Sequence, residues 1–249
     1  MKKITILFAL VVAVFTSCKS NDPNTDPNSS NDLTTGQIEF KAYPYGNIVE
    51  FYLQTKKVTI DWGDGFVDEF SPNDVKTGFT HEYAIQRSQN IKVNTDGMTY
   101  FSDSPDIISH STYSQELRFG NCSNLLVIRC SGTDFTVLDV SKCTALRELY
   151  CTGTQITVLD VSKCTVLEYL DCRSEYWEGK LTSLDVSKCT ALTRLNCVGN
   201  QLSASALNSL FNGLPTGNGA AIYCGHNPGY DTCDKTIAEK KGWFVGNID

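Results

Sequence analysis

The segment Leu146-Arg147-Glu148-Leu149-Tyr150-Cys151, followed by Leu159-Asp160-Val161-Ser162-Lys163-Cys164, decides the fold of this chain. Matching segments start at Leu125, Leu146, Leu167 and Leu192, so the steps between them are 21, 21 and 25 residues. Each unit reads L-x-x-[LI]-x-C, then a single apolar residue, then L-D-V-S-K-C, and the last unit lacks this second half. A period of about 20–50 residues is typical of arrays in which every repeat forms one supersecondary unit.

The repeat resembles the leucine-rich repeat, in the short bacterial variant with L-D-V-S found in internalin- and BspA-like surface proteins. The resemblance covers Leu117 to the C-terminus and implies a solenoid whose strands line a concave binding face. The asparagine that usually caps each turn of this family is Thr133 and Thr154 in two units, and returns at Asn200 and Asn227. We therefore expect a weak asparagine hydrogen-bond ladder in the early coils.

Stacking must supply the solenoid core, because one repeat cannot bury its apolar side alone. The spacing predicts three inward columns, which are Ile128, Leu149, Leu170, Leu195 and Ile222; Phe135, Ile156, Leu181 and Leu202; and Val140, Val161 and Val186. A solenoid also needs covered ends. We expect the preceding domain to cover the first coil and a helical cap over residues 203–249 to cover the last, with helices near 207–214 and 234–241 and with Trp243 and Val245 lying over the final coil.

Residues 37–105 alternate apolar and polar side chains and predict a small antiparallel β-sandwich. Within it, Val58 to Gly65 ends in W-G-D-G, and His81-Glu82-Tyr83 follows. These motifs resemble a PKD-type domain, which implies an immunoglobulin-like spacer or adhesion module. Asp61, Asp64, Asp68 and Glu69 suggest either a calcium site or, as we favour, turn-closing and edge carboxylates. The fold class expected for the chain is thus mostly β with short helices, a sandwich followed by a solenoid.

The N-terminus reads as an export signal. Lys2 and Lys3 precede an apolar run from Ile4 to Phe15, which is too short to span a bilayer. The small residues before Cys18 resemble a bacterial lipobox. We expect residues 1–17 to form a lipoprotein signal peptide, Cys18 to carry the lipid that anchors the protein to the outer membrane, and residues 18–36, rich in Asn, Asp, Ser and Pro, to form a disordered tether.

Composition narrows the function classes. The 249 residues carry a formal net charge of −7, so a nucleic-acid partner is not expected. Of the 11 cysteines, nine fall into two repeat columns, one from Cys130 to Cys224 and one from Cys122 to Cys189. Stacked strands lie about 4.8 Å apart, whereas a disulfide needs Cβ atoms about 3.8 Å apart. We expect reduced cysteine ladders in the core, with disulfides or zinc as the alternatives, and no cofactor or metal.

The residues that flank each strand centre are the predicted ligand-binding set. They are Arg129, Glu148, Tyr150, Tyr169, Asp171, Arg194 and Asn196, joined by Tyr176 and Trp177 on a four-residue insertion. Tyrosine and arginine dominate binding hot spots, so the set favours a protein or glycan ligand. The alternative is ordinary solvated strand residues. Three functions are considered: a surface lipoprotein that binds a macromolecule, a glycan-binding accessory protein of polysaccharide uptake, and a purely structural envelope protein. An enzyme that uses Glu148 and Asp171 is not expected, since an open sheet offers no cleft.

Overall fold

The computed structural model describes residues 36–44, 47–85, 87–103, 112–131, 136–174 and 178–247. The chain divides into two compact units, Met1–Asp32 and Leu33–Asp249, and everything described belongs to the second. The predicted signal peptide, Cys18 and nearly all of the predicted tether lie outside the described residues, and so do Thr133, Phe135, Tyr176 and Trp177. No helix in the described ranges is long and apolar enough to cross a bilayer.

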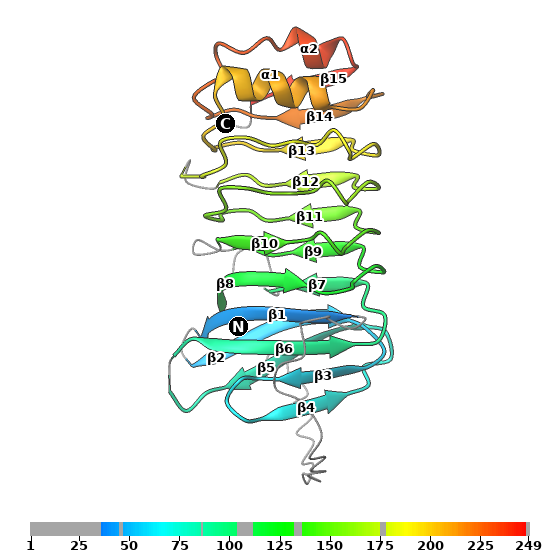
Figure 1. The fold of residues 1–249 in the computed structure, drawn as a ribbon, viewed down its shortest axis with the longest axis vertical. Helices are drawn as coiled ribbons and strands as arrows, with labels where there is room; N and C mark the ends of the chain where they lie inside the picture. Colours follow the sequence, from blue (N-terminus) through cyan, green and yellow to red (C-terminus); the bar gives the residue numbers. More distant parts are fainter. Residues whose placement is uncertain are drawn as a thin grey trace, which may run out of the picture. The chain divides into compact units, whose positions relative to one another are not determined.

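The first part of the described chain consists of antiparallel strands in two sheets (Figure 1). The strands are β1 (Gln37–Pro44), β2 (Ile48–Gln54), β3 (Val58–Asp61), β4 (Val67–Phe70), β5 (Lys76–Glu82), β6 (Gln89–Thr95), β7 (Tyr100–Ser102) and β8 (Thr112–Phe119). A six-stranded sheet has the order β10-β8-β1-β6-β3-β4, and a nine-stranded sheet has the order β15-β14-β13-β12-β11-β9-β7-β2-β5. The predicted β architecture of this segment is thus present, whereas its kinship to PKD domains stays a prediction.

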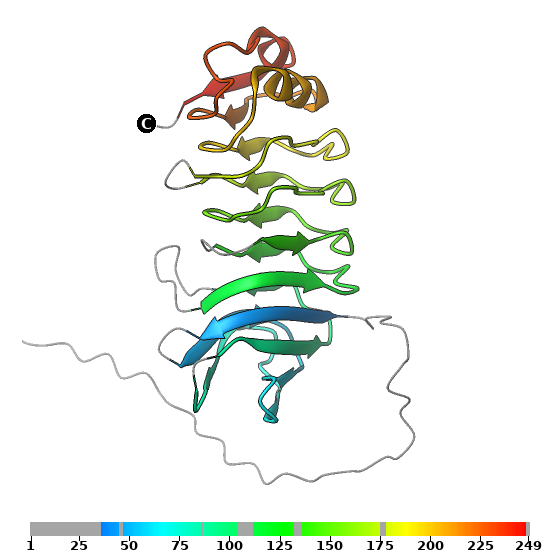
Figure 2. The same ribbon diagram turned by 60° about the vertical axis from the view of Figure 1, so that its left-hand side comes forward.

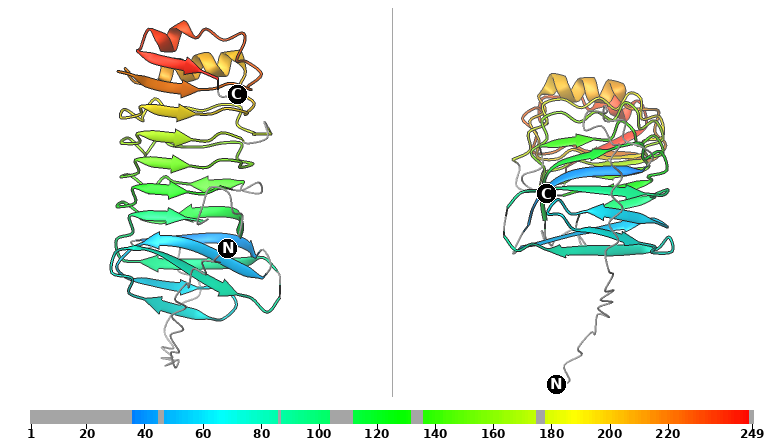
Figure 3. Two further views of the ribbon diagram at one scale, coloured as in Figure 1. Left: turned by 180° about the vertical axis from the view of Figure 1, so that it is seen from behind. Right: turned by 60° about the horizontal axis from the view of Figure 1, so that its bottom comes forward.

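The repeats fold as a β-solenoid of short parallel strands (Figures 2 and 3). The strands are β9 (Val127–Arg129), β10 (Val137–Asp139), β11 (Glu148–Tyr150), β12 (Tyr169–Asp171), β13 (Arg194–Asn196), β14 (Ala220–Tyr223) and β15 (Trp243–Gly246). Their register aligns Ile128, Leu149, Leu170, Leu195 and Ile222 side by side, and all five are buried. This confirms the first predicted core column, and burial of Ile156, Leu181, Leu202, Val140, Val161 and Val186 confirms the described members of the other two.

Each sheet contains strands from both sides of residues 105–106, where the domain boundary was predicted. Before it, β7 pairs with β2 on one side and, in parallel, with β9 on the other. After it, β8 pairs antiparallel with β1 and parallel with β10. Strand pairing therefore covers the first coil with the N-terminal strands. The boundary itself, like the rest of the domain division, stays a prediction.

The N-terminal core centres on Trp62 of the W-G-D-G motif, which is fully buried. Its indole N–H donates to Oδ2 of Asp68 over 2.8 Å, and the Tyr83 hydroxyl donates to its carbonyl over 2.9 Å. Asp61 and Asp64 accept hydrogen bonds from backbone N–H groups two residues further on. Three of the four carboxylates considered for calcium thus already bond within the turn, which favours the turn-closing interpretation.

The cysteine columns lie in the solenoid core. Nine of the ten described cysteines are buried and all ten are free thiols. Burial raises the pKa of every thiol in the column from Cys130 to Cys224, so these thiols stay protonated and act as small apolar groups. Cys130 Sγ lies 3.4 Å from the carbonyl oxygen of Tyr150 in the next coil. The prediction of reduced core ladders is confirmed for the described residues.

The C-terminal cap differs in part from the prediction. Helix α1 (Ala204–Gly213) has Ser203 as its N-cap and replaces the missing L-D-V-S-K-C segment, as expected. Helix α2 spans only Thr236–Glu239, shorter than the predicted 234–241. Before it, Asp234 accepts hydrogen bonds from the N–H and hydroxyl of Thr236, and after it Gly242 turns the chain at φ 84°. Trp243 and Val245 belong to β15, a further parallel strand, rather than merely lying over the final coil.

Candidate binding face

The described members of the predicted ligand-binding set come from β9, β11, β12 and β13 and lie on the outer face of the nine-stranded sheet, the side away from the solenoid core. Strand pairing aligns Val127, Glu148, Tyr169, Arg194 and Ala221 in one row, and Arg129, Tyr150, Asp171, Asn196 and Tyr223 in a second row. The sequence pattern predicts both rows. The structure extends the first row to Tyr100 and Phe244 and the second to Ser102 and Gly246.

Tyr150 is the centre of a side-chain cluster in the early coils. The Arg129 guanidinium carbon lies 4.2 Å from the centroid of its ring, and the Tyr169 ring centroid lies 4.9 Å away on the opposite neighbouring strand. The Tyr150 hydroxyl donates to Oε2 of Glu148 over 3.0 Å. Burial, reinforced by this bond to a carboxylate, raises the pKa of Tyr150 to about 12, so the hydroxyl remains a donor.

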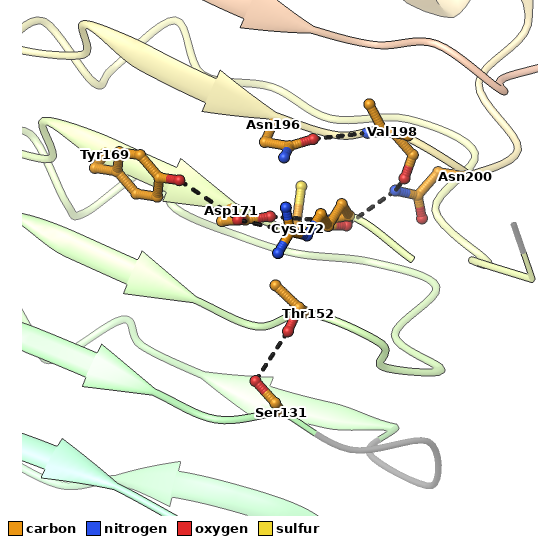
Figure 4. Close-up of polar contacts among 9 residues, drawn as sticks. Ser131, Thr152, Tyr169, Asp171, Cys172, Asn196, Val198 and Asn200 are labelled. Carbon is orange, nitrogen blue, oxygen red and sulfur yellow. Dashed lines mark hydrogen bonds and ion pairs between the residues drawn. The ribbon is translucent and has the colours of Figure 1, made fainter. Parts of the chain in front are cut away.

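The cluster continues through Tyr169 to Asp171 (Figure 4). The Tyr169 hydroxyl lies 3.4 Å from Oδ2 of Asp171, and the Arg173 side chain lies 3.8 Å from the same oxygen. Burial followed by the charge of Asp171 raises the pKa of Tyr169. Five of the predicted residues therefore form one connected network, from Arg129 through Glu148, Tyr150 and Tyr169 to Asp171.

Two predicted residues are not exposed. Asp171 retains 3% and Asn196 6% of its accessible surface, whereas the sequence pattern predicts an exposed row. Both short side chains bend back to accept a hydrogen bond from the backbone N–H two residues further on, at Arg173 and Val198. Figure 4 shows the Asn196 contact at the end of its strand. Asp171 and Asn196 therefore organise the face from beneath and are not free contacts for a ligand.

Side chains that the repeat pattern missed enlarge the face at both ends. On the N-terminal side, Tyr52 pairs with Ser102 and lies against Gly78, and the Lys76 ammonium lies 3.7 Å from the Tyr100 ring centroid. On the C-terminal side, Phe244 is 62% exposed. All of these lie outside the L-x-x-L-x-C pattern. The alternation of Trp243, Phe244 and Val245 is the signal that identifies Phe244 as outward facing.

The turn side of the solenoid also differs along its length. Asn200 donates to the carbonyls of Cys172, Cys197 and Val198, and Asn227 makes the equivalent set of bonds one coil later. Thr154, at the same repeat position, makes one side-chain hydrogen bond within the described ranges, donating to the carbonyl of Cys151 over 3.2 Å. The predicted weakening of the asparagine ladder is thus confirmed at Thr154.

Asp103 occupies a cysteine position at the start of the ladder. It follows β7 directly, as Cys130 follows β9, and it is fully buried. Its Oδ1 accepts from the N–H of Ser131, but among the described residues neither its Oδ2 nor Nε of neighbouring Arg129 has a hydrogen-bond partner. Burial raises the pKa of Asp103 to about 7. A carboxyl group therefore occupies an apolar column at the junction between the antiparallel N-terminal strands and the parallel strands of the solenoid.

The two acids of the outer face are already bonded to neighbouring groups. Glu148 and Asp171 are occupied by hydroxyl, guanidinium and backbone partners. Within the described ranges, no three His, Cys, Asp or Glu side chains lie close enough to hold a metal ion. Tyr176 and Trp177, the other predicted members of the site, belong to the residues outside the description. What the face offers is ordered aromatic rings, exposed arginine and hydrogen-bonding groups.

No protein-family model and no curated protein matches this chain. Among solved structures, similarity extends to the functional domain of InlJ from Listeria monocytogenes, which includes a cysteine ladder. The identity is 22% and the TM-score 0.33, over 54% of this chain and 39% of the other. The chain thus spans less than half the length of that structure.

Proposed function

We propose that this protein binds a protein partner through the outer face of its nine-stranded sheet and performs no catalysis. The observation that carries the proposal is the network from Arg129 through Tyr150 and Tyr169 to Asp171. Tyrosine and arginine supply large contact area, and rings held by their neighbours lose little conformational freedom on binding. An ordered row of such side chains on an open sheet suits a broad macromolecular contact.

The packing of Tyr150 favours a protein over a glycan. A sugar stacks on the free face of an aromatic ring, but Arg129 and Tyr169 approach the Tyr150 ring from the strands on either side. The ring therefore offers its edge and its hydroxyl to a ligand. Edges and hydroxyl groups suit the mixed polar and apolar surface of a protein. For this reason we place glycan capture behind protein binding.

We further propose that the protein is an outer-membrane lipoprotein anchored through Cys18 and exposed at the cell surface as an adhesion or recognition module. The support is the sequence alone, with Lys2 and Lys3, the apolar run and the small residues before Cys18. Replacement of Cys18 by alanine should move the protein from the membrane to the soluble fraction. Mass spectrometry of the native protein should detect lipid on Cys18, and an unmodified Cys18 would contradict the anchor.

The binding proposal is tested with the 249-residue chain against immobilised extracellular-matrix proteins and a glycan array. The variant Tyr150→Ala, Tyr169→Ala should lose protein capture at least tenfold, because it removes both central rings. Lys163→Ala is the matched control, since Lys163 is exposed and lies in the L-D-V-S-K-C segment, away from the outer face. Capture of glycans in place of proteins, lost in the tyrosine variant, would favour the uptake accessory. Unchanged capture in that variant would contradict the assignment of the outer face as the binding surface.

A further inference from the structure

Arg194, Ala221 and Phe244 form a patch at the C-terminal end of the outer face, here named the Arg194–Phe244 patch. They are cross-strand neighbours on β13, β14 and β15. Adjacent strands lie about 4.8 Å apart, so the backbones of the outer two are about 10 Å apart. Only the methyl group of Ala221 stands between a long cation and an exposed ring. A partner side chain can therefore approach both at once.

The patch presents a positive charge without internal compensation. Glu148 is bonded by Tyr150 and Arg129, Asp171 is buried, and Glu168 pairs with Arg147. Arg194 is exposed, and in the part of the chain that the structure describes it forms no ion pair. The acids of the face are thus occupied and this arginine is not. An incoming carboxylate would be the complementary group.

Phe244 adds a positioned apolar side chain. It is 62% exposed although it lies within a strand. A Cβ built on Gly246 would lie 2.7 Å from the Phe244 ring and 2.9 Å from the Tyr223 ring, so the absence of a side chain there makes room for both. The two ring centroids are 6.3 Å apart at 66°. The sheet therefore holds an exposed ring, Phe244, against the half-buried ring of Tyr223, and such a positioned aromatic side chain is typical of binding hot spots.

We propose that the Arg194–Phe244 patch is a subsite for a polypeptide segment that carries a carboxylate side chain next to an apolar one. The carboxylate meets the Arg194 guanidinium in a charge-assisted pair, and the apolar side chain packs on Phe244 and Tyr223. The inference rests on the proposed function, because it assigns the partner chemistry of one end of the same face. Arg194 then sets the charge preference of the site, and Phe244 contributes affinity without charge selectivity.

The test uses the 249-residue chain and an array of synthetic peptides. Each peptide pairs Glu or Asp with Leu or Phe, and matched peptides carry Lys or Gln in place of the acid. The acidic peptides should be retained about tenfold more strongly than the lysine peptides, a difference of about 1.4 kcal/mol. Arg194→Glu should invert this preference. Phe244→Ala should weaken retention of every peptide about tenfold and leave the preference unchanged.

Lys163→Glu is the control, because it changes the net charge equally on another side of the solenoid, and circular dichroism verifies the fold of each variant. A preference that Arg194→Glu does not alter would overturn the inference, and so would the retention of no peptide. Retention of acidic oligosaccharides instead, lost in Arg194→Glu, would overturn the polypeptide assignment.

Different results would refute the proposed binding face and the proposed subsite. Matrix-protein capture that is lost in the Tyr150→Ala, Tyr169→Ala variant but kept in Arg194→Glu and Phe244→Ala would overturn the inference and retain the face. Capture that no variant changes would overturn both.

Discussion

The early and the late coils of the solenoid achieve order in opposite ways. Around β11, the outer-face side chains hold one another, with Arg129 on Tyr150 and Tyr150 beside Tyr169. The turn behind them has the bond of Thr154 and a hydroxyl pair of Ser131 and Thr152 in place of a buried asparagine. From β13 to β15, Asn200 and Asn227 tie the turns of successive coils together, while Arg194 and Phe244 stand exposed. The packing of outer-face side chains is thus the distinguishing contribution in one region, and the bonds of buried asparagines to the backbone are the distinguishing contribution in the other.

This difference has a functional reading. Side chains that are bonded to one another offer a ligand a fixed shape but few hydrogen-bonding or charged groups without a partner. Where the turns hold the backbone, outer-face side chains can keep charged or apolar groups without partners, because the stability of the coil does not depend on contacts between those side chains. The late coils are therefore the place for a selective contact and the early coils the place for a preformed surface.

The largest expected effect concerns the junction before the early coils, where Asp103 stands in the cysteine ladder. Burial raises its pKa from 3.8 to about 7. The folded protein therefore binds a proton that the unfolded chain has released between these pH values, so stability is greatest below pH 4 for this group and falls as pH rises to about 7. The full shift corresponds to about 4 kcal/mol.

Urea unfolding between pH 4 and pH 8 measures this dependence. Asp103→Cys restores the repeat residue and should flatten the curve by most of that amount. A variant curve parallel to the wild-type curve would show that Asp103 does not titrate in this range.

The next largest effect is expected from a substitution in the turns of the late coils. Asn200→Ala removes the donor for three carbonyls and leaves buried polar groups unpaired, so it should lower the free energy of unfolding by about 3 kcal/mol. Thr154→Ala at the equivalent early position should cost less than about 1 kcal/mol, because one bond is lost at a partly exposed site. Urea titration of both variants gives the comparison. Equal losses would remove the proposed contrast between the two regions.

A smaller difference in unfolding free energy is expected between substitutions at the early and the late end of the outer face. Tyr150→Ala should cost about 1–2 kcal/mol of unfolding free energy, because Arg129, Glu148 and Tyr169 all lose a neighbour. Phe244→Ala should stay within about 0.5 kcal/mol, since the ring is mostly in solvent. Thermal melting of the pair is sufficient to rank them. A destabilising Phe244→Ala would mean that this ring serves the fold and not a partner.

Sequence reasoning reached some parts of this arrangement and not others, for physical reasons. A repeat fixes register, so the alignment of Tyr150 with Asp171 and of Glu148 with Tyr169 follows from spacing. Spacing does not reveal whether a short polar side chain points outward or bends to its own backbone, as Asp171 and Asn196 do. The outer-face roles of Tyr100 and Phe244 were missed because their strands lie outside the repeat and join the sheet through tertiary pairing.

The smallest effect tests whether residue identity or coil position causes the weak early turn. Thr154→Asn introduces the side chain that Asn200 and Asn227 use, at the same place in the repeat. If identity is the cause, the new amide donates to the carbonyls of its own and the preceding coil and stabilises the protein by about 1 kcal/mol. Thr154→Ser, which keeps the hydroxyl, should leave stability unchanged. If Thr154→Asn gives no gain, the cause lies in the early coil itself, whose backbone would then be too far from the added amide.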